Sequence, residues 1–114
     1  MLEVSSLQKL LRQFAAARDW EQFHTPKNLA ASISIEAAEL LEVFQWRTED
    51  KWPLSEDEAG KVKEELADVL IYLLRFADLA EIDLMAITQA KLDLNARKYP
   101  VEKARGNSRK YTEL

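Results

Sequence analysis

Four carboxylates occur in this sequence as two pairs, and each pair is spaced by about one helical turn: Glu36 with Glu39, and Glu65 with Asp68. Residues three apart lie on the same face of a helix. Because each residue advances about 100° around a helix, Glu36 and Glu65 fall inside the apolar stripes of their helices. An ionised carboxylate buried among apolar side chains costs several kcal/mol unless an opposite charge compensates it. The two pairs therefore predict a bound cation.

The ligand types narrow the identity of that cation. Carboxylates without histidine or cysteine suit Mg²⁺, with Mn²⁺ as a substitute, and both ions complete their shells with water and substrate phosphate. The chain has no cysteine and one histidine, His24, so a thiolate site is excluded and a di-iron bundle, which needs Glu-x-x-His on two helices, is disfavoured. We interpret His24 as a hydrogen-bonding loop residue rather than a catalytic base. Solvated glutamates on helix surfaces remain the alternative interpretation of the pairs.

Local signals predict four helices that position these residues. Serine, threonine and aspartate precede apolar residues that recur every three to four positions, which is typical of capped amphipathic helices. The predicted caps are Ser5 or Ser6, Thr25 before Pro26, Ser55 with Glu58, and Asp83. The predicted helices end at about residues 18, 46, 79 and 99. The third helix is apolar around nearly its whole circumference between residues 62 and 79, which indicates that partners surround it and that the chain self-associates.

Composition sets the fold class and excludes several functions. The chain has 114 residues with only 2 glycines and 3 prolines, so we expect one all-α domain over residues 1–114, with a basic and mobile tail over residues 101–114. A net charge of -4 argues against binding of a nucleic acid polymer. Neither a secretory signal nor an apolar run long enough to cross a membrane is found, so we expect a cytoplasmic protein.

Two strings resemble the MazG-like all-α nucleoside triphosphate pyrophosphohydrolases: EAAELLEVFQW at residues 36–46 and EELADVLIY at residues 64–72. The flanking strings are similar to the dCTP pyrophosphatase branch of that family. They are RDWEQFH at residues 18–24, Tyr99-Pro100, and SRKYTEL at residues 108–114. The resemblance therefore covers nearly the full chain.

The resemblance implies a reaction: Mg²⁺-dependent hydrolysis of a deoxynucleoside triphosphate, foremost dCTP or a modified dCTP, to the monophosphate and pyrophosphate. It carries Glu36, Glu39, Glu65 and Asp68 over as catalytic metal ligands, and leaves open which carboxylate, if any, is the general base. It also implies a house-cleaning role in the nucleotide pool. The family's assembly is a homo-oligomer of four-helix units, in which helical-bundle dimers pair into a dimer-of-dimers tetramer.

The resemblance further points to a base-binding site. Trp20 and Trp46 are expected to form aromatic walls with Tyr72 nearby, and the amide of Asn95 is expected to read the exocyclic pattern of the base. Core packing is the alternative role for the two tryptophans. Leu11 departs from the family, because members of the dCTP branch can carry a polar residue there, and base or sugar recognition is then looser.

A second set of expected substrate-binding residues follows helical spacing in the fourth helix. Lys91, Asn95, Lys98 and Tyr99 share a face that can reach the phosphates and the sugar. A solvated polar face is the alternative for these residues.

Two rival functions remain open at this point. A non-catalytic helical interaction module would owe its acidic residues to solubility and would show no metal dependence of stability. A phosphohydrolase for a non-nucleotide diphosphate would keep the acidic site but not need Trp20, so the Trp20→Ala variant separates it from a nucleotide enzyme.

Overall fold

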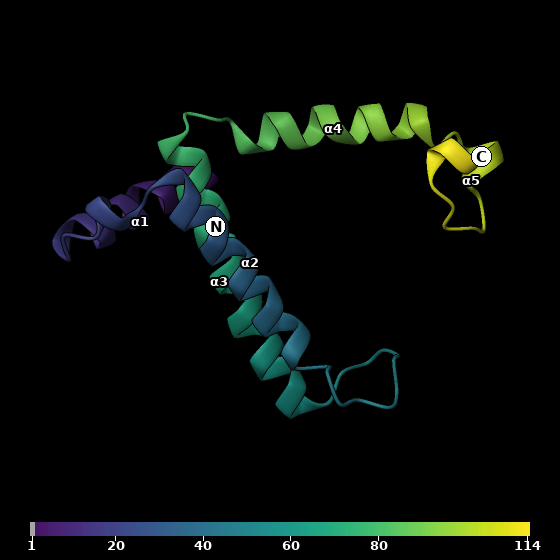
Figure 1. Cartoon of the computed structure of the whole chain (residues 1–114), viewed down its shortest axis with the longest axis horizontal. Coiled ribbons are helices and arrows are strands. Elements are labelled where there is room, and N and C mark those ends of the chain that lie inside the picture. Colours follow the sequence, from purple (N-terminus) through teal and green to yellow (C-terminus); the bar gives the residue numbers. More distant parts are fainter. Residues whose placement is uncertain (1) are drawn as a thin grey trace. The chain divides into compact units, whose positions relative to one another are not determined.

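The computed structural model describes residues 2–114, and over that range every regular element is a helix. This confirms the all-α fold class. The chain divides into two compact units, the first ending at Glu81 and the second running from Ile82 to Leu114. The elements are α1 (Val4–Ala17), η1 (Glu21–Phe23), α2 (Pro26–Glu42), α3 (Glu56–Leu79), α4 (Leu84–Lys98), α5 (Val101–Ala104) and η2 (Tyr111–Glu113) (Figure 1). That residues 1–114 form a single functional domain stays a prediction.

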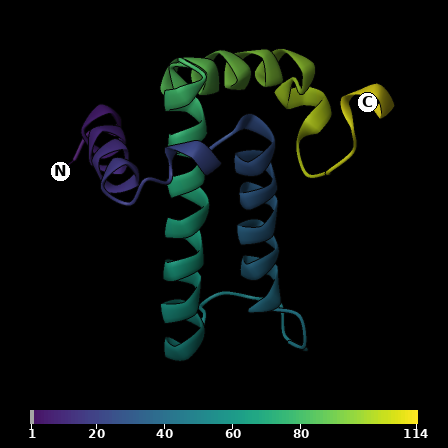
Figure 2. The same ribbon diagram turned by 60° about the vertical axis from the view of Figure 1, so that its left-hand side comes forward.

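The first unit is built on α2 and α3, which run antiparallel and side by side along their lengths (Figure 2). The helix α1 packs against the second half of α3, where the Gln8 side-chain amide donates a hydrogen bond of 3.0 Å to the Leu74 carbonyl. The buried apolar residues of this unit are few: Ala15, Leu29, Leu74 and Ala77. The helix α3 therefore contributes to contacts on two sides, with α1 and with α2.

Three of the predicted caps are confirmed. The Thr25 and Asp83 side chains accept hydrogen bonds from backbone N–H groups in the first turns of α2 and α4. Ser55 and Glu58 form a reciprocal capping box at the start of α3. Each cap satisfies donors that a helix N-terminus leaves without an intrahelical partner.

Two helix ends differ from the prediction. Ser5 and Ser6 lie inside α1, whose N-cap is Glu3 without a side-chain cap bond, so neither serine begins that helix. The helix α2 ends at Glu42 rather than at about residue 46. Its last residues continue instead as tight turns, with the Phe44 N–H donating to the Leu41 carbonyl over 3.0 Å. A hydrogen bond between residues three apart, as in a 3₁₀ turn, is common at the end of an α-helix.

Part of the apolar surface of α3 is exposed in a single chain, and the prediction that partners surround this helix stays a prediction. Leu66 is 52% exposed and Leu70 is 46% exposed. Single exposed apolar residues are ordinary, but neighbours on one helix face form an apolar patch.

The second unit is α4 followed by a tail that folds into α5 and η2. Within it, the Tyr111 ring packs edge-on against Tyr99 at a centroid distance of 6.1 Å, and the Lys98 ammonium lies 4.7 Å above the same ring. These contacts attach η2 to the end of α4, and the mobility of the tail stays a prediction. Over residues 2–114, none of the helices has the length and apolar character that a membrane crossing requires.

Candidate active site

The antiparallel pairing of α2 and α3 brings three acidic side chains together. One carboxylate oxygen from each of Glu36, Glu65 and Asp68 lies within 4.8 Å of the other two. All three side chains are half-buried. The Oε2 atoms of Glu36 and Glu65 are buried and have no hydrogen-bond partner among the described residues. Because an unpaired buried acceptor is costly, a bound cation would stabilise these oxygens.

The electrostatics of the cluster lead to the same conclusion. The pKa of Glu36 is raised from 4.5 to about 7, first by burial and then by the neighbouring carboxylates of Glu39, Asp68 and Glu65. The pKa of Glu65 is also raised, first by burial and then by Glu39 and Asp68. Both shifts mean that the protein alone disfavours the ionised forms. Three hard oxygen donors are a set that fits Mg²⁺ or Mn²⁺, so the acidic cluster can hold a divalent cation.

The fourth predicted ligand occupies a different position. Glu39 lies beside Glu36 and Glu65, since it contributes to the raised pKa of both, but it is not one of the three residues whose oxygens converge within 4.8 Å. Its role as a ligand stays a prediction. The neighbouring acids Glu42 and Glu64 are exposed.

The tryptophans predicted as base walls occupy irregular segments that follow helices. After α1, Asp19 adopts a positive φ of 55° and the Trp20 N–H donates to the Ala15 carbonyl over 3.0 Å, so the chain turns sharply there. The Trp20 ring packs edge-on against Phe14 at a centroid distance of 5.7 Å and is 43% exposed. Trp46 follows the end of α2 and is 86% exposed, so it does not pack in the core of a single chain.

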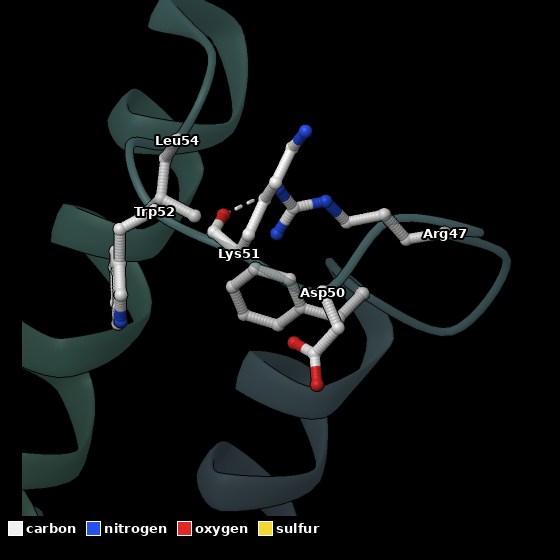
Figure 3. Close-up of a pocket in the computed structure, with 6 residues that line it drawn as sticks. Arg47, Asp50, Lys51, Trp52 and Leu54 are labelled. Atoms are coloured by element: carbon white, nitrogen blue, oxygen red, sulfur yellow. Dashed lines mark hydrogen bonds between the residues drawn. The ribbon is translucent and has the colours of Figure 1, made fainter.

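The segment between α2 and α3 forms a cavity of about 360 Å³ lined by Phe44, Arg47, Asp50, Lys51, Trp52 and Leu54 (Figure 3). Arg47 organises it, because its guanidinium donates to the Lys51 carbonyl over 3.1 Å and pairs with Glu58 at 3.2 Å. The Arg47 side chain thereby links this segment to the start of α3.

His24 is a hydrogen-bonding loop residue, as predicted. Its Nδ1 accepts a hydrogen bond of 3.0 Å from Nε of Arg75, whose side chain is buried in the first unit. No sequence motif assigned Arg75 to a site. A signal was present, because Arg75 is a charged residue within the most apolar stretch of the chain, but its partner lies 51 positions away and is invisible to helical spacing.

The remaining predicted binding residues divide between the two units. Tyr72 is half-buried on α3 and lies one turn after Asp68. Lys91 and Asn95 lie with Ile87, Thr88 and Leu92 around a shallow, open hollow on the surface of α4. Lys98 and Tyr99 contact the Tyr111 ring. The substrate-binding roles of all these residues stay predictions.

The fold and the site define a helical protein with a carboxylate cluster suited to a divalent cation. Comparisons with known proteins identify its family. A model of the MazG-like family matches residues 31–114. The dCTP pyrophosphatase 1 of Homo sapiens is 45% identical over 116 residues, which cover 97% of this chain and 67% of the human protein. The dCTP pyrophosphatase 1 of Mus musculus is 42% identical over the same shares. The chain belongs to the MazG-like family.

A solved structure agrees with this assignment. The crystal structure of a pyrophosphatase from Archaeoglobus fulgidus is 47% identical in sequence, with a TM-score of 0.74, and the match covers 88% of this chain and 94% of that one. The fold described above therefore has an experimentally determined counterpart.

Proposed function

We propose that this protein is a nucleoside triphosphate pyrophosphohydrolase that converts a deoxynucleoside triphosphate, foremost dCTP or a modified dCTP, to the monophosphate and pyrophosphate. The observation that carries the proposal is the convergence of Glu36, Glu65 and Asp68, with two buried carboxylate oxygens unpaired. The relatives named dCTP pyrophosphatase 1 support the reaction and its substrate. The role that fits is house-cleaning of the nucleotide pool in the cytoplasm.

The acidic residues have different proposed roles at the substrate phosphates. Glu36, Glu65 and Asp68 would hold a divalent cation, Mg²⁺ or in its place Mn²⁺, which supplies neutralisation of phosphate charge and a lowered pKa for bound water. Glu39 lies beside two of these residues without joining the three converging oxygens. It is therefore placed to serve either as a fourth ligand or as the general base that accepts a proton from the attacking water.

The tryptophans provide the surface for the base in this proposal. Trp20 and Trp46 are both exposed, and an exposed indole face can stack on a planar base. Tyr72 lies on the helix that carries Glu65 and Asp68. Stacking tolerates every base, so selectivity for cytosine requires hydrogen bonds such as those of an amide.

The proposal also assigns substrate-binding roles to four residues of the second unit. Asn95 supplies the amide that reads the base, while Lys91, Lys98 and Tyr99 contact the phosphates and the sugar. Lys91 and Asn95 lie on the same face of α4, beside a shallow hollow, which allows both to contact one ligand. Lys98 is already engaged with the Tyr111 ring, so its binding to phosphate requires that contact to give way.

We also propose that the protein assembles as a dimer of dimers. The apolar patch on α3 that includes Leu66 and Leu70 is exposed in a single chain, and a second copy of the bundle would cover it. Light scattering coupled to size-exclusion chromatography measures this directly: a monomer in solution would contradict the assembly.

The proposed reaction is tested by pyrophosphate release from a panel of canonical and modified deoxynucleoside and ribonucleoside triphosphates with Mg²⁺. We expect dCTP or a 5-modified dCTP to be turned over, and the Glu65→Gln variant to lose about 100-fold or more in kcat/KM, since metal-site charge stabilisation is worth several kcal/mol. The matched control is Glu64→Gln, which neutralises the exposed neighbouring acid on the same helix and should keep activity.

The outcome that contradicts the proposal is equally concrete. If no nucleotide releases pyrophosphate, the proposal is wrong, and either a non-nucleotide diphosphate substrate or a non-catalytic interaction module is favoured. If the Trp20→Ala variant keeps its activity with an unchanged KM, Trp20 does not bind a base, and a non-nucleotide substrate is favoured.

A further inference from the structure

The second half of α3 holds a buried positive charge that the proposed chemistry does not use. Arg75 is only 4% exposed. Its nearest carboxylate oxygen, Asp78 Oδ2, is 3.9 Å away, and the other oxygen of Asp78 pairs with Arg12 at 2.6 Å. The close polar contact of Arg75 is therefore its hydrogen bond of 3.0 Å to Nδ1 of His24.

This hydrogen bond determines the state of the His24 ring. A guanidinium only donates, so Nδ1 of His24 must accept through its lone pair, and the proton of the neutral ring lies on Nε2. Burial lowers the pKa of His24, the Arg75 charge adds to that effect, and Glu21 opposes it. The lowered pKa favours the neutral ring, which is the form that accepts the hydrogen bond from Arg75.

A buried guanidinium is not expected to increase the stability of the folded protein by itself. Replacing a buried ion by a well-packed apolar side chain is often neutral or stabilising, because the charge must leave water. An apolar residue at position 75 would match the surrounding stretch of α3. What arginine adds at this place is a directed contact with the loop that carries His24.

That loop also carries Trp20, and both of its flanks are tied to the same five residues of α3, 74–78. On the N-terminal side, α1 is held by the bond from Gln8 to the Leu74 carbonyl and by the pair of Arg12 with Asp78. On the C-terminal side, the loop is held by Arg75 through His24. Figure 2 shows the chain crossing α3 between the end of α1 and the start of α2.

The helix that holds the Trp20 loop is also the helix that supplies the acidic cluster. Arg75 lies seven residues after Asp68 on α3, which is about two turns and about 10 Å along the axis. A single uninterrupted helix thus sets the spacing between the cation ligands and the loop that carries the aromatic wall.

We propose that Arg75, acting through His24, is a positioning residue that holds the Trp20 indole at the place where it stacks on the nucleobase. The inference rests on the proposed function, in which Trp20 binds the base. Arg75 does not touch substrate, so its removal weakens base binding while the chemistry at the acidic cluster continues. The consequence is a rise in KM at nearly constant kcat.

The test compares three variants in steady-state hydrolysis of dCTP by the full chain with Mg²⁺. Arg75→Met keeps the length of the side chain and removes its donors, while His24→Leu removes the acceptor; both should raise KM by about 5-fold and change kcat by less than about 2-fold. His24→Asn places an amide oxygen near the position of Nδ1 and should restore KM to the wild-type value. The control is Lys9→Met, which removes an exposed cation of α1 and should leave both constants unchanged.

A double-mutant cycle with Trp20→Ala separates positioning from general loosening. Once the indole is gone, Arg75→Met should change KM by less than about 2-fold, because the group that Arg75 positions is absent. Independent effects of the two substitutions would overturn the proposal. Thermal unfolding of each variant shows that it is folded; if Arg75→Met does not fold, the contrast between His24→Leu and His24→Asn decides in its place.

The two proposals fail in different ways. Wild-type protein without pyrophosphate release from any nucleotide overturns the proposed function, and with it the role of Arg75. Wild-type turnover with the same KM in folded Arg75→Met, or a fall in kcat alone, overturns only the positioning role. Failure of His24→Asn to restore KM also overturns it, since the acceptor would then not be what matters.

Discussion

Two regions of α3 bury charge about two turns apart, and they do so in opposite ways. At Glu65 and Asp68, carboxylates converge with Glu36 and leave two buried oxygens without a partner. At Arg75, the buried charge is surrounded by an acceptor, His24, and by an acidic neighbour on its own helix. One region is uncompensated and the other is compensated from within.

This contrast indicates which region is suited to bind a ligand and which is suited to fix the surrounding structure. An uncompensated cluster keeps a cost in the folded state that an added cation removes, so binding energy is available there. A compensated network gains nothing from a ligand, but it fixes the elements that supply its partners, here α1 and the loop after it. The acidic cluster is thus suited to bind a ligand, whereas the Arg75 network is suited to preserve geometry.

The largest effect that we expect to distinguish the two regions is stabilisation of the folded protein by a bound cation. Mg²⁺ at about 100 times its dissociation constant should stabilise the wild type by about 2.7 kcal/mol, because only the folded state presents the cluster. For a domain of this size that corresponds to a rise in Tm of about 10 °C, measured by differential scanning fluorimetry against the protein in EDTA.

The matched variants sharpen this test. Glu65→Gln should lose the Mg²⁺-dependent rise and should itself raise Tm in EDTA, because it removes one of the mutually repelling charges. Glu64→Gln, the exposed neighbour, should keep the full response. A wild-type Tm that is the same in Mg²⁺ and in EDTA contradicts the assignment of this region as a binding site.

An intermediate effect is expected at the compensated region, where removing either partner should not be equivalent. His24→Leu leaves the Arg75 guanidinium buried without its acceptor and should cost about 1–3 kcal/mol of unfolding free energy. Arg75→Met removes the charge itself and should cost less than about 1 kcal/mol, because an apolar side chain suits the site. Urea unfolding measures both, and equal losses would show that the hydrogen bond does not compensate the charge.

These two regions also show how far the sequence alone predicts the molecule. The start of α3 could be predicted because its signal, Ser55 with Glu58, is local, and the acidic pairs could be predicted because helical spacing places them on defined faces. The end of α2 could not, since residues 43–46 contain no glycine or proline and turn through hydrogen bonds that the sequence pattern does not mark.

The compensated region escaped prediction for a physical reason. The bond between His24 and Arg75 joins residues 51 positions apart, and only the packing of the loop onto α3 brings them together. The sequence shows the anomaly, a charge in an apolar stretch, without its partner. The exposure of Trp46 could not be predicted from the sequence either, because it depends on where α2 ends.

The smallest expected effect is a pH dependence of stability that belongs to the compensated region. The pKa of His24 in the folded protein is lowered from 6.5, chiefly by burial and then by Arg75, while in the unfolded chain it returns to 6.5. As pH falls below 6.5 the unfolded chain binds the proton first, so the contribution of His24 to stability is complete above pH 6.5 and is lost as pH falls through the lowered pKa. Protonated His24 would also lose the lone pair that accepts from Arg75.

Because carboxylates titrate in the same range, the measurement is a difference between wild type and His24→Asn, whose amide accepts from Arg75 but does not titrate. The unfolding free energies of the two proteins should run parallel above pH 6.5 and diverge below it, with the wild type losing more. The carboxylates of the acidic cluster cancel in this difference, since both proteins carry them. Parallel curves down to pH 5 would mean that the neutral form of His24 is not what the buried arginine requires, and the contrast between the two ends of α3 would then rest on packing rather than on charge compensation.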